Sequence, residues 1–258
     1  MLSDDKADIE HRDGLTPYRG FAQVYDRFMG DIPYQDWADY VEALWSKHSL
    51  SPKLVLELAC GTGAMTAEMQ RRGYEMIGAD ASADMLAMAK EKNPEILYLW
   101  QDMRSFELYG TVDAVLCVCD GLNYLLEEED LCQTFRLVNN YLNPGGLFIF
   151  DMNTDYKFRR ILADNTFAEA GKDASYIWEN FYDTDEMLNT YDLQFFIKTS
   201  GGLFERFEEC HCQRAYSVET VQKNLRLAGL ALEVVYDAFT QSPPAEDSER
   251  LYFVARRT

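Results

Sequence analysis

The sequence has no long hydrophobic run. Its longest apolar stretches fall well short of the roughly 18 residues that a transmembrane helix needs. The acidic N-terminus has none of the features of a secretory signal peptide. We therefore expect a chain that does not span a membrane and works in the cytoplasm.

Basic residues are also scarce. Lysine and arginine number 24 against 44 aspartates and glutamates, which gives a net charge of −20 and a pI near 4.5. Nucleic acids and anionic membranes both require a basic face, so the charge argues against both as partners. We interpret the acidity chiefly as a source of solubility, although an acidic surface would also suit a basic protein acceptor.

The six cysteines do not form a recognisable disulfide or zinc pattern. Three of them lie in expected core strands or beside a glycine turn, which suits buried thiols in a reducing compartment. Cys210, His211 and Cys212 are adjacent, whereas zinc sites space their cysteines by about two to four residues and need four ligands. Neighbouring positions on a strand also point to opposite faces. We therefore predict no metal site.

The chain is organised around residues 54–63. Leu54 to Leu58 is a short apolar run that is typical of a buried parallel strand. A glycine turn follows, and a helical pattern begins near Thr62. Gly61 and Gly63 allow the backbone to bend sharply and a ligand to lie against it, beside the free N–H groups of the helix N-terminus. This stretch predicts a cofactor site, the alternative being a glycine turn that only joins strand to helix.

Two common nucleotide motifs are incomplete here. A phosphate-binding P-loop needs a lysine and a serine or threonine after its last glycine, but Ala64 and Met65 stand there. A dinucleotide fingerprint needs a third glycine where this chain has Thr66. A nicotinamide-dependent oxidoreductase therefore stays as an alternative, but a weaker one.

The stretch Glu57-Leu58-Ala59-Cys60-Gly61-Thr62-Gly63 resembles the E-x-G-x-G-x-G motif of class I methyltransferases that depend on S-adenosylmethionine (SAM). It departs from that motif at Ala59, where the family has glycine. The resemblance implies that SAM is the cofactor. It also implies cofactor contacts from residues of this turn: Glu57, Ala59, Cys60, Gly61 and Gly63.

Two acidic residues follow the next two expected strands. Residues 74–79 predict a second strand that ends at Asp80, with Ala81 beside it and Ser82 capping a helix that runs to about residue 92. A carboxylate at this strand tip can accept from both hydroxyls of a ribose, although an acid here would also favour the helix dipole. After a third strand at 96–100, the resemblance implies that Asp102 accepts from the adenine amino group and that Met103 contacts the ring.

A fourth apolar strand is expected at 112–119, leading into residues 120–125. In the family this segment faces the methionine half of SAM and the methyl acceptor, so Cys119 and Asn123 join the expected cofactor contacts. A helix over about 131–142, a turn at 143–146 and a fifth strand at 147–150 follow, and this strand ends at Asp151.

Residues 153–213 break this alternation. They predict a short helix near 156–162 and three antiparallel strands at 176–182, 191–198 and 203–213, with a hairpin turn at Gly201-Gly202. From residue 218 a helix, a strand at 230–237 and a strand at 250–256 follow. Two strands joined without a helix must pair antiparallel, which distinguishes a methyltransferase sheet from a dinucleotide-binding one.

The expected fold is therefore α/β: a Rossmann-like sheet of seven strands with a terminal antiparallel hairpin, helices on both faces and an inserted antiparallel β lid. We expect an N-terminal helical cap at 1–50, a SAM-binding domain formed by 51–152 and 214–258, and the lid at 153–213. Two amphipathic helices are predicted around 21–28 and 37–44, over the ligand cleft. Tyr18 and Tyr25 belong to this cap, either as packing residues or as hydroxyls that touch cofactor or acceptor.

The resemblance extends from about Tyr18 to the C-terminus and is strongest to uncharacterised bacterial methyltransferases with the same insert, which are related in architecture to small-molecule N-methyltransferases. It implies transfer of the SAM methyl group to a small-molecule acceptor, such as an amine, by in-line displacement (EC 2.1.1.-). An amine must lose its proton first, and the candidate bases are His211 and either Tyr25 or Tyr18. His211 could equally be a structural histidine. A SAM-binding protein without turnover is a further alternative.

Overall fold

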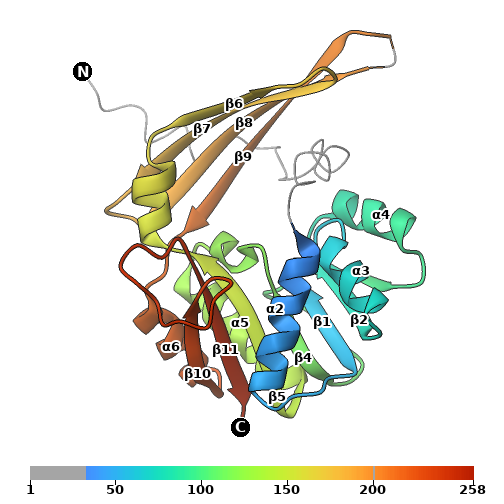
Figure 1. The fold of residues 1–258 in the computed structure, drawn as a ribbon, viewed down its shortest axis with the longest axis vertical. Helices are drawn as coiled ribbons and strands as arrows, with labels where there is room; N and C mark the ends of the chain where they lie inside the picture. The colour runs from blue at the N-terminus through green and yellow to red at the C-terminus, as the bar shows by residue number, and fades with distance from the viewer. Residues whose placement is uncertain (1–32, 200) are drawn as a thin grey trace.

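The computed structural model describes residues 33–199 and 201–258, which form a larger and a smaller β-sheet (Figure 1). The larger sheet has seven strands in the order β10-β11-β5-β4-β1-β2-β3. These strands are β1 (Leu54–Leu58), β2 (Glu75–Asp80), β3 (Leu97–Trp100), β4 (Val112–Cys117), β5 (Leu142–Asn153), β10 (Leu230–Asp237) and β11 (Arg250–Arg257). The first five are parallel, and β11 pairs antiparallel with both β5 and β10. The Rossmann-like sheet with a terminal antiparallel hairpin is thus confirmed.

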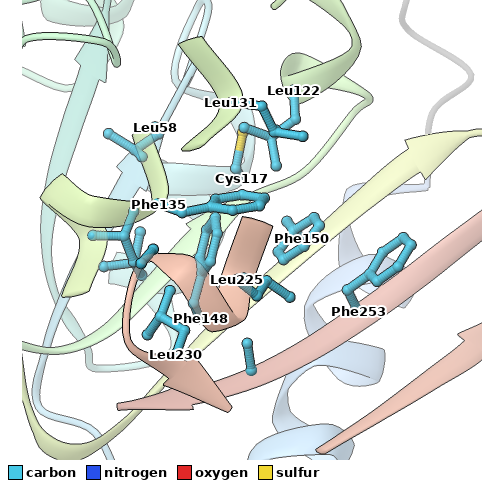
Figure 2. Close-up of a cluster of buried hydrophobic side chains, with 14 of the residues drawn as sticks. Leu58, Cys117, Leu122, Leu131, Phe135, Phe148, Phe150, Leu225, Leu230 and Phe253 are labelled. Atoms are coloured by element: carbon cyan, nitrogen blue, oxygen red, sulfur yellow. The ribbon is translucent and has the colours of Figure 1, made fainter. Parts of the chain in front are cut away.

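Helices cover both faces of this sheet because its central strands are apolar on both sides. Leu56, Phe148 and Phe253 pack with α5 (Glu128–Tyr141) and α6 (Val218–Leu227) on one face, the cluster drawn in Figure 2. Their chain neighbours, such as Val55 and Ile149, pack on the other face with α2 (Tyr34–Lys47) and α3 (Ala64–Arg71). Helix α4 (Ala83–Lys92) contacts β2 and β3.

Helix α2 differs from the expected cap. It packs its buried side chains, including Trp45, against a face of the sheet and touches α3. Only its first residue, Tyr34, lines the cleft described below. The reason is that six of its fourteen residues are buried and apolar, enough to make it part of the main core rather than a separate cap. The expected helix at 21–28 lies outside the described residues.

Two boundaries at the central strands also differ from expectation. Strand β4 ends at Cys117, two residues early, because Cys119 and Asp120 have positive φ angles of 65° and 52° that no strand accommodates. The expected turn at 143–146 is instead absorbed in β5, where Val112 pairs with Leu142 and Ala114 with Leu147. The intervening residues form a bulge with Gly145 at φ 80°.

The smaller sheet is antiparallel and has four strands, one more than expected. They are β6 (Thr166–Ala170), β7 (Ala174–Asp183), β8 (Leu188–Lys198) and β9 (Phe204–Arg214). A single turn of π-helix, η2 (Lys157–Leu162), links it to β5. The unexpected strand β6 has little apolar patterning, since four of its five residues are exposed. Because the insert follows the carboxyl end of β5, the sheet stands beyond that end of the main sheet, as Figure 1 shows.

Candidate functional site

The glycine turn after β1 is held in a left-handed path. Ala59, Gly61 and Gly63 have φ angles of 53°, 53° and 74°. Cys60 N–H donates to the carbonyl of Ala79 at 3.1 Å, which fastens the turn to β2. A Cβ at Gly61 would meet no atom within 4 Å, so this residue borders open space, whereas one at Gly63 would collide with the Tyr98 hydroxyl. The turn therefore exposes backbone at Gly61 and packs tightly at Gly63.

The departure from the family motif at Ala59 has a structural counterpart. A Cβ added to Gly121, in the 3₁₀ turn η1 (Gly121–Tyr124), would lie 2.8 Å from the Cβ of Ala59 and 3.0 Å from Cys117 Sγ. The methyl group of Ala59 therefore occupies the space that Gly121 leaves empty. The pair explains how alanine is tolerated where the motif has glycine.

Asp80, at the tip of β2, is fastened by the turn that it faces. Its Oδ2 accepts from Gly61 N–H and its Oδ1 from Ser82 N–H, each at 2.8 Å. Burial raises the pKa of Asp80, while these backbone donors oppose that rise. The carboxylate is thus fixed beside the glycine turn, and each oxygen has lone pairs left for a further donor.

Asp102 is placed at the cleft by a partner that the sequence did not reveal. The Arg104 side chain donates to both of its carboxylate oxygens, with Nη2 to Oδ2 at 2.6 Å, and Arg104 N–H donates to Oδ1 at 2.8 Å. These bonds hold the pKa of Asp102 below its ordinary value, so it stays ionised. Arg104 also reaches Asp130 at 3.2 Å.

These segments enclose a cleft of about 350 Å³ at the carboxyl ends of the parallel strands. It brings together seven predicted site residues: Ala59, Gly61, Asp80, Ala81, Asp102, Met103 and Cys119. Seven further residues that line the cleft were not predicted from the sequence: Ser82, Met85, Gln101, Arg104, Gly121, Tyr124 and Leu125. A narrow extension of about 30 Å³ adds Tyr34 and the predicted residues Glu57 and Cys60. The size suits a cofactor-sized ligand.

Glu57 is a buried carboxyl group at the extension. It accepts a short hydrogen bond from the Thr66 hydroxyl, and only 2% of its surface is exposed. Burial raises its pKa from 4.5 to about 8, with a further contribution from nearby Asp80, against the opposing effect of Thr66. A cation entering the extension would favour its ionised form.

Two predicted contacts among the described residues, Gly63 and Asn123, line neither the cleft nor its extension. Asn123 is fully buried, and its amide donates to the carbonyls of Asn153 and Arg214 and accepts from Asn153 N–H, so it joins β5 to β9. Tyr18 and Tyr25 lie outside the described residues.

His211 lies on β9, not in the cleft itself. Its ring is 3% exposed. Nδ1 lies 3.4 Å from the hydroxyl of Tyr124, which lines the cleft, and Nε2 lies 2.9 Å from Glu209 Oε2. The candidate base thus reaches the cleft through Tyr124.

A charged cluster that the sequence did not predict lies where β4 ends, beside the carboxyl-terminal part of β5 and the start of β11. Arg250 donates to Asp120 Oδ1 at 2.6 Å and forms a short ion pair with the fully buried Asp151. Gln213 of β9 donates to Asp120 Oδ2 at 2.7 Å. Lys157 is close enough to interact electrostatically with both carboxylates, and the cluster sits beside Cys119, which lines the cleft. Arg250 lies 99 positions from Asp151 and 130 positions from Asp120 in the sequence, and no local pattern reveals contacts over such separations.

The comparisons with known proteins agree with this geometry. Residues 55–146 match the family model described as a methyltransferase domain. Over 246 residues the chain is 39% identical to the Bacillus subtilis (strain 168) protein named "Putative methyltransferase YqeM", covering 93% of this chain and 97% of that protein. The chain belongs to the class I SAM-dependent methyltransferase family.

A solved structure agrees with that assignment. A SAM-dependent methyltransferase from Clostridium acetobutylicum ATCC 824 superposes with a TM-score of 0.83 at 29% identity, covering 93% of this chain and 99% of that one. The methyltransferase fold, its cofactor SAM and its enzyme class are therefore established, and the dehydrogenase alternative finds no support. A more distant relative is the dTDP-3-amino-3,6-dideoxy-alpha-D-glucopyranose N,N-dimethyltransferase of Streptomyces fradiae, 29% identical over half of each chain (50% and 52%).

No helix within 33–199 and 201–258 is long and apolar enough to cross a membrane. In the same part of the chain, no group of three or more histidine, cysteine, aspartate or glutamate side chains is placed to hold a metal ion.

Proposed function

We propose that this methyltransferase transfers the methyl group of SAM to the nitrogen of a small-molecule amine in the cytoplasm. The observation that carries the proposal is the cleft at the carboxyl ends of β1, β2 and β4, with Asp80 at one end and the charged cluster of Asp120, Asp151 and Arg250 past the other. Six free cysteines suit a reducing compartment.

The cleft residues fit the parts of SAM. Asp80 would accept from the ribose hydroxyls, while ionised Asp102 and Met103 would hold the adenine. The methionine half would lie against Ala59, Gly61 and Cys119, with Glu57 facing its positive charge. Because strand β1 lies between β4 and β2, a ligand with adenosine at β2 and β3 extends its sulfonium half toward β4.

Two observations support an amine as the methyl acceptor: the negative charge of the protein and the named substrate of a relative. The whole chain carries a net charge of −20, so a cationic amine is attracted to the protein. The Streptomyces fradiae relative acts, by its name, on an amino sugar. The lid sheet beyond the cleft would restrict access to small molecules, which disfavours a protein acceptor.

When bound, SAM supplies an electrophilic methyl group on a sulfonium sulfur. The protein's task is then to align the acceptor nitrogen, exclude water and remove the proton of the ammonium form. We propose His211 as the base for this step. Asp120, the less buried carboxylate of the cluster, would orient the amine.

The test is a methyl-transfer assay with SAM and a panel of primary and secondary amines, among them glucosamine, glycine and putrescine, against matched alcohols. Release of S-adenosylhomocysteine that depends on an amine, with mass spectrometry placing the methyl on nitrogen, is the expected result. Transfer to the alcohols alone would refute the amine assignment. An Asp120→Asn variant should raise KM for the amine while leaving the affinity for S-adenosylhomocysteine unchanged.

A further inference from the structure

The carboxyl end of β9, the last strand of the lid, and the residues just after it are hydrogen-bonded to the cleft wall. Besides the contact between His211 and Tyr124, Gln213 donates to Asp120, the Arg214 side chain donates to the carbonyl of Leu126, and the Tyr216 hydroxyl donates to the carbonyl of Leu125 at 2.7 Å. The segment that follows β4 is therefore held in register with β9. Such support fixes side chains well enough for catalysis.

Within this seam, three side chains form a line that starts in the cleft and ends in the protein interior. Tyr124 lines the cleft, its hydroxyl lies 3.4 Å from His211 Nδ1, and Glu209 Oε2 lies 2.9 Å from His211 Nε2. Both His211 and Glu209 are buried, at 3% and 5% exposure. Contacts of this length often tighten when substrate binds.

The chemistry of the three groups sets the direction of their hydrogen bonds. A carboxylate can only accept, so Glu209 places a proton on His211 Nε2. A neutral imidazole with its proton on Nε2 presents Nδ1 as an acceptor, and Tyr124 then donates to it. A tyrosine oxygen whose proton points at His211 acts toward the cleft as an acceptor. That is the arrangement needed to receive a proton from a bound ammonium group.

Tyr124 is also at the appropriate end of the cleft. It follows β4, whereas Asp80 and Asp102 follow β2 and β3, on the far side of β1 in the strand order. With adenosine held by the two aspartates, Tyr124 lies on the side of the sulfonium and the acceptor.

We propose that Tyr124, His211 and Glu209 form a proton relay that deprotonates the acceptor amine, with Tyr124 as the catalytic residue. The ammonium N–H bond breaks as its proton passes to the Tyr124 oxygen, and the tyrosine proton passes to His211 Nδ1. The imidazolium so formed is stabilised by Glu209, and the nitrogen keeps the electron pair it needs to accept the methyl group. After product release, His211 Nδ1 returns its proton to the Tyr124 oxygen as Tyr124 releases its own proton to water in the open cleft. This inference rests on the proposed amine acceptor and replaces direct contact of His211 with the substrate.

The experiment compares Tyr124→Phe, His211→Gln and Glu209→Gln with Tyr182→Phe as the matched control. Tyr182 is a buried lid tyrosine whose hydroxyl bonds Asp155 at 2.6 Å, on η2's side of the lid and outside the relay. For each variant, kcat and KM are measured with the best amine of the panel between pH 6 and 10. Calorimetry measures the affinity for S-adenosylhomocysteine.

The relay predicts that Tyr124→Phe and His211→Gln lower kcat by roughly 10²-fold or more near pH 7, and Glu209→Gln by roughly tenfold, with the affinity for S-adenosylhomocysteine kept. These deficits should shrink as the pH passes the pKa of the amine itself, because the acceptor then arrives without its proton. Among described residues, the titratable groups against His211 are Glu209, Tyr124 and its strand partner Tyr191. The control should behave as wild type at every pH.

A loss of kcat in the relay variants that is equal at all pH values, or no loss of kcat, would overturn the relay. Either result would leave the assignment as a methyltransferase intact. Methyl transfer to alcohols but not amines would overturn the proposed acceptor instead. If the variants do not fold, labelled-histidine NMR of the wild type still decides, because the chain has only three histidines. A neutral His211 with its proton on Nε2 supports the relay, and one protonated on Nδ1 refutes it.

Discussion

The buried carboxyl of Glu57 makes the stability of the ligand-free protein depend on pH. In the unfolded chain this group ionises near 4.5, whereas in the folded protein burial raises its pKa to about 8. Between these values the folded state binds one more proton than the unfolded state, so the free energy of unfolding falls as pH rises. Above pH 8 both states are ionised, and the contribution of Glu57 no longer changes.

The Glu57→Gln variant removes this titration while keeping the size of the side chain and a group that can accept from Thr66. Each pH unit changes the free energy of unfolding of the wild type by about 1.4 kcal/mol relative to the variant. Between pH 6 and pH 8 the variant should therefore gain about 2–3 kcal/mol of stability over the wild type. We expect the difference in unfolding free energy, measured by urea denaturation without SAM, to grow by that amount and then level off above pH 8.

The matched control is Glu68→Gln on the neighbouring helix. Hydrogen bonds and charge from Arg71 and Arg72 lower the pKa of Glu68, so it is ionised throughout this pH range. Its substitution should therefore change stability by an amount that does not vary with pH. A Glu57→Gln difference that stays flat between pH 6 and 9 would refute the account of a buried, proton-binding Glu57.

Two further predictions concern packing. Gly121→Ala should destabilise the fold by about 1–3 kcal/mol, because its Cβ would press on Ala59 and Cys117. Adding Ala59→Gly to the same chain should recover much of that loss. Additive losses in the double-mutant cycle would refute this contact. Phe148→Ala should lower the free energy of unfolding, measured by urea denaturation, by about 3–5 kcal/mol, because Phe148 is fully buried. Phe204→Ala, at a half-exposed lid residue, should lower it far less. Similar losses in the two variants would contradict the placement of the core.

Much of the fold was predictable because its signals are local. The apolar run at 54–58, the glycine turn and the acid at Asp80 each occupy a few consecutive residues, and the parallel topology then brings them to one edge of the sheet. The terminal pair β10 and β11 was predictable for the same reason, since two strands without an intervening helix can only pair antiparallel.

What escaped prediction depends on contacts between distant residues. Strand β6 has no apolar alternation and exists because it pairs with β7. The ion pairs of Arg250 with Asp120 and Asp151, and the contact of His211 with Tyr124, join segments separated by 87 to 130 positions. Asn123 was assigned to the cofactor from its place after β4, but the structure directs its amide into the seam between β5 and β9.

The central claim is that Asp80 and the glycine turn hold the adenosine half of SAM. The most direct test is calorimetric titration of S-adenosylhomocysteine into wild type and Asp80→Asn, with Asp113→Asn as the control. Asp113 also accepts from two backbone N–H groups, those of Lys53 and Leu54, but at the opposite end of the sheet. Loss of a charged hydrogen-bond acceptor predicts binding weaker by roughly 10- to 100-fold in Asp80→Asn and unchanged in Asp113→Asn. Wild-type affinity in Asp80→Asn, or equal losses in both variants, would contradict the account.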